Sequence, residues 1–163
     1  MGLKFFKFLT PPKDNFDRRC FKLLTLVEPC VRVAFSNGNN KKDLPDDVNI
    51  SMEVSFTSKA KAHYELLSNT IVLNKKLLSF DEVLTIVVHE LIHVSQCFLG
   101  DLSWSRTKKC LLWKNEQVFL TEPWEDEAYG QQEHLAVKIV SMCDKKTIAL
   151  LSSLALVRTT KKF

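Results

Sequence analysis

The sequence lacks several features that would assign a protein to a class at once. Its five cysteines are widely spaced and include no Cys-x-x-Cys pair, which excludes a zinc ribbon and indicates reduced thiols. Lysines interrupt the apolar run of residues 1–9, so we do not expect this segment to be a signal peptide. No stretch is long and apolar enough to span a membrane, and no internal repeat is visible. We therefore expect a cytoplasmic protein.

The sequence also has no large excess of positive or negative charge. The formal net charge is +4 over 163 residues, and lysine and arginine are scattered along the chain. Scattered cations do not form a stripe that could follow a phosphate backbone, so we do not expect a nucleic-acid partner. Proteolysis associated with DNA remains a weaker interpretation of the mild positive charge.

The most informative segment that the sequence does contain is HELIH, at residues 89–93. Four residues advance about 400° along a helix, so His89 and His93 project from one face and can share a zinc ion. Glu90 lies beside them, where it can take a proton from a zinc-bound water. Two ordinary core histidines would not explain a carboxylate inside an apolar run, since a buried carboxylate is costly unless paired. The segment predicts half of a metallopeptidase site.

Local signals place this motif in the middle of a buried helix. Ser79 and Glu82 form the pattern of a capping box, and Gly100 offers a stop. The residues between them are mostly apolar, which is typical of a helix that is buried on most sides. The motif is therefore expected on a rigid core element, as a preorganised site requires.

Two histidines leave a catalytic zinc ion one protein ligand short. Metzincins carry a third histidine six positions after the second, but Leu99 stands at that position here. Cys97 lies one turn beyond His93 on the same helix, and three consecutive turns cannot converge on one ion. The third ligand must therefore come from another element.

The richest source of a third ligand is the acidic helix start PWEDEAY, at residues 123–129. Glu125 and Glu127 point about 160° apart on a helix, so only one of them can face the metal. We prefer Glu125 and keep Glu127 as the alternative. The acidic residues could instead simply favour the N-terminus of a helix through its dipole.

Together the segments 89–96 and 123–129 resemble the gluzincin type of zincin-like metallopeptidase, particularly its small single-domain phage and bacterial forms. The resemblance extends over roughly residues 54–140, but only these two motifs are specific. It implies a zinc site and a helix-borne general base. The residues that it assigns are the zinc ligands His89, His93 and Glu125 and the base Glu90.

One position departs from the family pattern Glu-x-x-Ala-Asp, which otherwise supports Glu125 by register. This chain has Tyr129 where the pattern ends in Asp, so a carboxylate that would orient a zinc-bound histidine is absent there. Gln96 or Asp126 could take its place. Tyr129 could instead act in catalysis by donating its hydroxyl to the developing oxyanion.

The two remaining histidines are predicted to have no catalytic role. His134 lies nine positions after Glu125, about 180° around a helix, and therefore faces away from the metal. His63 falls in a predicted strand that could border the cleft, where we interpret it as an ordinary strand residue.

The rest of the chain predicts helices near both ends and strands between them. The predicted helices cover 17–27, ending near Pro29, a segment from 121–123 to beyond 140, and 148–157. The predicted strands cover 48–56, 63–66 and 70–73, with a turn at 68–69, and 111–113 with 117–120 form a hairpin or one irregular excursion. Residues 31–35 extend the first helix or form a strand, and 36–47 form an exposed loop.

The sequence thus predicts a zincin-like α+β fold in a single domain over residues 1–163. A small mixed sheet would pack on the motif helix, with a second helix carrying the third ligand, and by resemblance 63–66 or 70–73 would be the edge strand that pairs with substrate. The predicted function is that of a zinc endopeptidase acting on a peptide or protein. The alternative is a zinc-binding interaction module without turnover, and no pattern indicates an oligomeric state.

Overall fold

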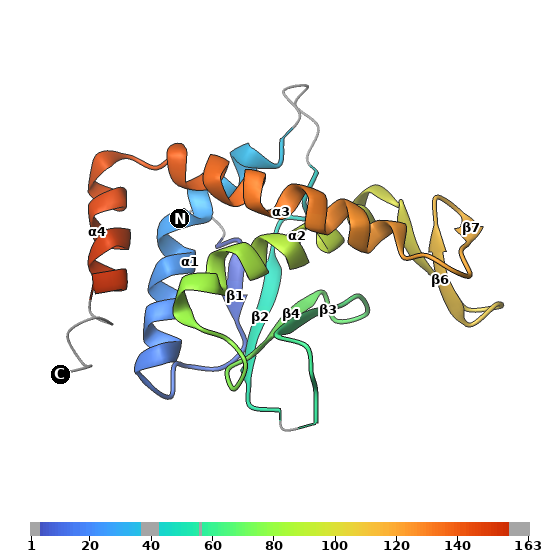
Figure 1. The fold of residues 1–163 in the computed structure, drawn as a ribbon, viewed down its shortest axis with the longest axis horizontal. Helices are drawn as coiled ribbons and strands as arrows, with labels where there is room; N and C mark the ends of the chain where they lie inside the picture. Colours follow the sequence, from blue (N-terminus) through green and yellow to red (C-terminus); the bar gives the residue numbers. More distant parts are fainter. Residues whose placement is uncertain (1–3, 37–42, 56, 157–163) are drawn as a thin grey trace.

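The computed structural model describes residues 4–36, 43–55 and 57–156, and in this part of the chain its fold is of the predicted α+β class. In Figure 1, two helices lie side by side above the larger sheet, and a smaller sheet lies at one end of the pair. The helices are α1 (Asn15–Ala34), α2 (Val83–Leu99), α3 (Pro123–Ser141) and α4 (Lys145–Leu156). The adjacent pair is α2 and α3.

The larger sheet has the strand order β1-β2-β4-β3. Its strands are β1 (Phe6–Phe8), β2 (Val48–Glu53), β3 (Ala62–Glu65) and β4 (Thr70–Asn74). The first three strands in that order run parallel, and β3 runs antiparallel to β4. The sheet is therefore mixed, as predicted, and β3 is an edge strand in the part of the chain that the structure describes.

The strands of the larger sheet differ from the prediction mainly in β1 and β2, since β3 and β4 match the predicted segments 63–66 and 70–73 to within one residue at each end. The strand β1 was not predicted, because three residues interrupted by Lys7 are too short to show a pattern of alternation. The strand β2 ends at Glu53, before the predicted end at residue 56, which lies outside the described residues.

The register of the sheet decides which side chains face the helices. Ile50 pairs with Ile71, and Ile71 pairs with Tyr64, so these three side chains share one face. Ile50 and Ile71 belong to the core that the sheet forms with α1 and α2. Tyr64 therefore faces the helices, whereas its neighbour His63 lies on the opposite face.

The helix that carries the motif begins and ends as the sequence predicts. The Ser79 hydroxyl and backbone N–H both donate to the Glu82 carboxylate, at 2.7 and 3.2 Å, in a capping box. A 3-10 turn, η1 (Phe80–Glu82), leads into α2. Gly100 ends α2 in the left-handed region at a φ of 86°, which glycine adopts without steric cost.

The prediction that the first helix ends near Pro29 is wrong, because α1 continues to Ala34. Proline inside a helix costs about 3 kcal/mol, since it removes one backbone hydrogen bond and crowds the preceding turn. Val27 and Val31 are completely or almost completely buried on either side of it. Each such burial contributes about 1.5 to 3 kcal/mol, which offsets the cost and extends the helix through residues 31–34.

The smaller sheet is antiparallel and was predicted only in part. It contains β5 (Leu102–Ser105), β6 (Cys110–Trp113) and β7 (Glu116–Gln117). The predicted hairpin is present, and its turn residues Lys114 and Asn115 have φ values of 49° and 67°, as a two-residue turn of this kind requires. The strand β5 was not predicted, and β7 is shorter than the predicted segment 117–120.

The last two helices close the fold. The helix α3 begins at Pro123 and runs beyond residue 140 as predicted, while α4 begins at Lys145, three residues before the prediction. Figure 1 shows α4 beside α1, and the Arg19 guanidinium of α1 donates a hydrogen bond to the carbonyl of Leu154. This contact joins the C-terminal helix to the N-terminal one.

Among the described helices, the segment Phe80–Leu99 is long and apolar enough to cross a membrane by length and composition. The prediction that no stretch of the chain is long and apolar enough is therefore wrong. In the fold 56% of this segment is buried, and it carries two histidines and a glutamate. It is the central helix of the protein core.

Candidate metal centre

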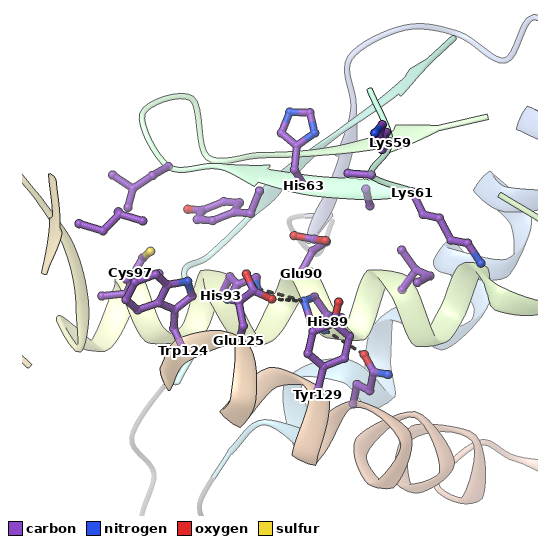
Figure 2. Close-up of a pocket in the computed structure, with 18 residues that line it drawn as sticks. Lys59, Lys61, His63, His89, Glu90, His93, Cys97, Trp124, Glu125 and Tyr129 are labelled. Carbon is purple, nitrogen blue, oxygen red and sulfur yellow. Dashed lines mark hydrogen bonds and ion pairs between the residues drawn. The ribbon is translucent and has the colours of Figure 1, made fainter. Parts of the chain in front are cut away.

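Two turns of α2 and the first turn of α3 bring His89, His93 and Glu125 together (Figure 2). The Nε2 atoms of the two histidines lie 3.1 Å apart. The Glu125 carboxylate places Oε2 at 3.2 Å from His89 Nε2 and Oε1 at 3.3 Å from His93 Nε2. One ligand atom from each residue lies within 4.8 Å of the other two, so the group can hold a metal ion.

The packing of α3 on α2 determines this arrangement. Ala128 is completely buried one turn after Glu125, and its small side chain allows the two helices to approach closely. Trp124, at the start of α3, is also buried. The first turn of α3 therefore lies over the middle of α2, with the Glu125 side chain directed at the histidines.

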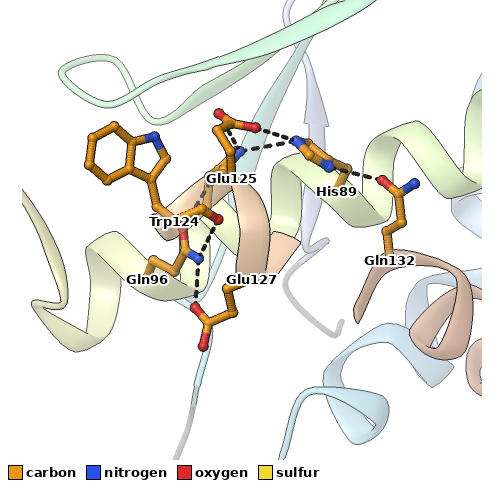
Figure 3. A network of polar contacts seen from close by, with 7 residues as sticks. His89, Gln96, Trp124, Glu125, Glu127 and Gln132 are labelled. Carbon is orange, nitrogen blue, oxygen red and sulfur yellow. Dashed lines mark hydrogen bonds and ion pairs between the residues drawn. The ribbon is translucent and has the colours of Figure 1, made fainter. Parts of the chain in front are cut away.

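Glu127, the alternative ligand, points elsewhere. Its Oε2 accepts a hydrogen bond of 2.7 Å from Nε2 of Gln96, as Figure 3 shows. Of the two acids, the structure brings Glu125, the preferred one, to the histidines. Asp126, which the sequence analysis considered as an orienting residue, is exposed.

The outer nitrogen of each histidine faces a glutamine side chain. The distance from His89 Nδ1 to Gln132 Oε1 is 2.9 Å, and the distance from His93 Nδ1 to Gln96 Oε1 is also 2.9 Å. An amide oxygen can only accept, so each Nδ1 must carry the proton and donate it. In a neutral ring the Nε2 atom then has a free lone pair, and in both histidines this atom faces the centre.

The centre is therefore a cluster of acceptors with no donor of its own. Two imidazole lone pairs and two carboxylate oxygens meet at 3.1 to 3.3 Å, an arrangement that repels itself unless a cation or a proton lies between them. Burial, followed by repulsion from His93, lowers the pKa of His89, which disfavours a proton there. A metal cation satisfies all these atoms, so the residues fit a metal.

The types of ligand atom favour divalent transition metals over calcium and magnesium. Two imidazole nitrogens with one carboxylate suit zinc and other divalent transition metals, whereas calcium and magnesium prefer oxygen ligands only. The three side chains could therefore hold one metal ion between them.

Glu90 lies next to the centre and is nearly inaccessible, at 5% exposure. Burial raises the pKa of this carboxyl to about 8, repulsion from Glu125 adds to the shift, and a hydrogen bond with the Tyr64 backbone opposes it. In Figure 2 Glu90 lies between α2 and β3, facing the space above the histidines. It is therefore a carboxyl group that can gain or lose a proton near neutral pH.

The centre opens into a cleft of about 590 Å³. Its walls are β3 and the preceding segment on one side and α2 with the start of α3 on the other (Figure 2). Lys59 and Lys61 line the cleft, and so do the apolar side chains of Leu66, Leu102 and Leu111. The cleft is open to solvent along an edge strand, which suits an extended ligand.

Tyr129 stands at the rim of this cleft. Its ring centroid lies 4.6 Å from that of His89, and the residue is 65% exposed. It replaces the carboxylate of the family pattern but makes no hydrogen bond to a histidine among the contacts of the described residues. The aromatic contact restricts the His89 ring from one side.

The other histidines lie away from the metal ligands. In Figure 2, His63 points away from Glu90, and its Nε2 lies 3.5 Å from Oε1 of Glu65 on the same strand. His134 is exposed on α3. Cys97 borders the cleft one turn beyond His93, and its sulfur is not part of the candidate metal group.

Sequence reasoning missed one residue of the site, Gln132. It lies seven positions after Glu125, which is two helical turns, so both side chains are on the face of α3 that meets α2. That spacing was visible in the sequence. The gluzincin pattern places the orienting residue at position 129 instead.

Comparisons with family models, curated proteins and solved structures find no match to this chain. The geometry of the site therefore provides the support for a function.

Proposed function

We propose that the protein is a zinc-dependent peptidase. The observation that carries this proposal is the convergence of two imidazole nitrogens and one carboxylate beside the buried Glu90, on the floor of an open cleft. Two histidines and one glutamate, with a coordination position open to the cleft, form a ligand set typical of catalytic zinc. Structural zinc sites instead have four protein ligands, usually including cysteine.

The catalytic step requires a base and a proton carrier as well as the metal. A bound zinc ion would supply Lewis acidity, polarising a carbonyl group and lowering the pKa of a water molecule. Glu90 accepts the proton of the attacking water at its carboxylate and delivers it to the leaving amine nitrogen. Burial raises the pKa of Glu90 to about 8 in the metal-free chain, and the positive charge of a bound zinc ion would lower it again, which favours the carboxylate form that accepts the proton.

The substrate binds along β3. This strand pairs with β4 at one edge, and residues 62–64 of it border the cleft. An extended peptide can add to such an edge through backbone hydrogen bonds and so bring its scissile bond over the histidines. The substrate class is therefore a peptide or an unfolded protein segment.

Tyr129 completes the proposed site from the α3 side. Its ring lies against His89 and lines the cleft, so its hydroxyl is close to the space that a substrate would occupy. A tyrosine hydroxyl donates a hydrogen bond and can stabilise the oxyanion that develops on the scissile carbonyl. We expect Tyr129→Phe to lower kcat while leaving zinc binding unchanged.

The substitution Glu90→Gln tests the function. It keeps the size of the side chain but removes the base, so we expect cleavage of casein and of a fluorogenic peptide library to fall about 100- to 10,000-fold. Zinc content and melting temperature are measured on the same samples. Glu133→Gln, on an exposed position of α3, is the matched control and should cleave like the wild type. Full activity of Glu90→Gln would contradict the proposed mechanism.

The alternative is a zinc-binding interaction module that does not turn over substrate. This alternative rests on the absence of a carboxylate at position 129. However, the side chain of Gln132 on the same helix accepts a hydrogen bond from His89. Stoichiometric zinc together with no cleavage of any library peptide would favour the module.

A further inference from the structure

We propose that Glu127 is a positioning residue that fixes the orientation of His93 through Gln96, an inference that rests on the proposed zinc site. The three side chains form one chain of hydrogen bonds across the interface of α2 and α3. His93 Nδ1 lies 2.9 Å from Gln96 Oε1, and Gln96 Nε2 lies 2.7 Å from Glu127 Oε2. Figure 3 shows the Gln96 amide in contact with the backbone of Trp124 and the side chain of Glu127, both in the first turns of α3.

The partners of Gln96 determine which way its amide points. Its Nε2 lies 2.7 Å from the Glu127 carboxylate and 3.0 Å from the backbone carbonyl of Trp124. Both partners can only accept, so the amide must direct its NH₂ group at them and its oxygen at His93. A reversed amide would place oxygen against oxygen at both contacts.

The orientation of this amide sets the protonation of the metal ligand. With the amide oxygen facing it, His93 Nδ1 must donate, which leaves the lone pair on Nε2 free for the metal. A reversed amide would present N–H groups to Nδ1 and favour the proton on Nε2, where it blocks coordination. Glu127 thus acts on the metal site without touching it.

Burial makes this control effective. Gln96 is 3% exposed and His93 is 7% exposed, so water cannot easily replace the partners of the amide. The bond to Glu127 is assisted by its negative charge and is therefore stronger than the neutral bond to the Trp124 carbonyl. The hydrogen bond to Glu127 therefore contributes most of the interaction energy that holds the Gln96 amide in this orientation.

The two acids of the motif consequently have different tasks. Glu125 faces the histidines directly, and Glu127 holds Gln96 on the other side of the α3 turn. Because two residues correspond to a rotation of about 200° around the helix, the side chains of Glu125 and Glu127 point about 160° apart.

Zinc affinity of single and double variants tests the inference. We expect Glu127→Ala to weaken zinc binding about 10-fold and Gln96→Ala about 10- to 100-fold, measured by competition with a chromogenic chelator. Asp126→Ala is the matched control, because it removes the same charge from the neighbouring exposed position. It should change the affinity less than about twofold.

The double variant Glu127→Ala with Gln96→Ala distinguishes a chain from two separate effects. If Glu127 acts through Gln96, its loss adds nothing once the amide is gone, so the double variant should bind zinc like Gln96→Ala alone. Glu127→Gln retains an acceptor oxygen but loses the charge, so its zinc affinity should lie between those of Glu127→Ala and the wild type. Multiplying effects in the double variant, or an equal loss in Asp126→Ala, would overturn the inference.

A readout that needs no activity comes from the histidine protons. In the zinc-loaded protein, the Nδ1 proton of His93 should give a slowly exchanging downfield resonance in proton NMR, and this proton should exchange faster in Glu127→Ala. Unchanged exchange would contradict the inference. If the wild type binds no zinc, the proposed function fails instead, so the two failures are distinguishable.

A second observation, independent of the metal centre, concerns Cys30 and Cys143. Cys30 lies in α1 and Cys143 follows the end of α3, and their sulfur atoms are 3.6 Å apart although the residues are 113 positions apart. Both cysteines are partly exposed. Small movements of two side chains would bring the sulfurs to bonding distance.

We infer that these two thiols form a disulfide bond when the protein meets a low-molecular-weight disulfide. One cysteine thiolate attacks the reagent and releases one of its thiols, and the second cysteine then displaces the other thiol. The two cysteines are oxidised and the reagent is reduced to two thiols. Because the bond closes a long loop, it restricts the unfolded chain strongly and should raise the melting temperature.

Oxidised glutathione serves as the probe. We expect the intact mass to fall by two hydrogen atoms, with faster migration in a non-reducing gel and a melting temperature higher by several degrees. Cys30→Ser and Cys143→Ser should abolish these changes, whereas Cys110→Ser, in the smaller sheet, should keep them. Addition of glutathione without the internal bond would overturn the inference.

Discussion

Gln132 of α3 accepts a hydrogen bond of 2.9 Å from Nδ1 of His89 in α2, so a candidate metal ligand joins the two helices. The bond holds the imidazole with Nε2 directed at the centre. A neutral amide thus occupies the position at which many zinc-bound histidines meet a carboxylate. An amide in place of a carboxylate keeps the His89 ring in the same orientation but adds no negative charge beside it.

The first prediction follows from that contact. Gln132→Ala should weaken zinc binding about 10- to 100-fold, because the His89 ring loses the partner that fixes its tautomer. Gln132→Glu should bind zinc at least as tightly as the wild type, since a carboxylate also accepts the bond. Competition with a chelator measures both values, and Gln131→Ala on the exposed side of α3 is the control. An unchanged affinity in Gln132→Ala would remove Gln132 from the site.

The second prediction separates the two acids of α3. Glu125→Gln should lower zinc affinity on the order of 100-fold, because a neutral amide is a much weaker ligand than a carboxylate. Glu127→Gln should lower it by less than the roughly 10-fold expected for Glu127→Ala. Zinc content after dialysis against a weak chelator gives the comparison. The reverse ranking would identify Glu127 as the ligand and show that the packing of α3 differs from this structure.

The third prediction concerns the stability that the metal confers. Zinc binds the folded chain, so zinc at 100 times its dissociation constant should stabilise the protein by about 2.7 kcal/mol. For a chain of this length that corresponds to a rise in melting temperature of about 5 to 10 °C. Addition of a chelator should reverse the shift, and His89→Ala with His93→Ala should show none. A zinc-dependent shift that survives in that double variant would place the metal elsewhere.

The fourth prediction concerns the metal-free protein and the buried Glu90. Its pKa is about 8 in the folded chain and about 4.3 when unfolded. The folded state therefore binds more protons than the unfolded state between these values, and stability should fall as the pH rises from about 4.3 to about 8. The slope is at most about 1.4 kcal/mol per pH unit.

Glu90→Gln removes this titration. The metal-free variant should be more stable than the wild type at pH 8, and the two should converge near pH 4.5, as thermal unfolding across that range can measure. Glu133→Gln again serves as the control. Such a gain in stability would indicate that Glu90 is kept for chemistry and not for folding. A less stable variant at pH 8 would contradict the cost attributed to the buried carboxylate.

Much of the fold follows from local signals. The capping box of Ser79 with Glu82 and the stop at Gly100 set the limits of the motif helix within a turn, because both depend on neighbouring residues only. The turn at 68–69 likewise marks the strands on either side of it. Residues within one turn or one hairpin interact through short-range geometry, which a sequence pattern can express.

The errors arise where distant contacts outweigh a local preference. Pro29 signals the end of a helix, but the buried Val27 and Val31 continue it. The strand β1 is only three residues long and exists because it pairs with β2, more than forty positions later. Such stabilisation comes from parts of the chain that a local window does not contain.

The sequence by itself determined that His89 and His93 share one face of a helix with Glu90 beside them, because helical geometry relates residues four apart whatever surrounds them. Only the tertiary structure decided that Glu125, rather than Glu127, meets these histidines and that Gln96 and Gln132 hold the rings. The reason is physical. The direction of a side chain on α3 relative to α2 depends on the rotation at which two helices pack, which the close contact at Ala128 sets.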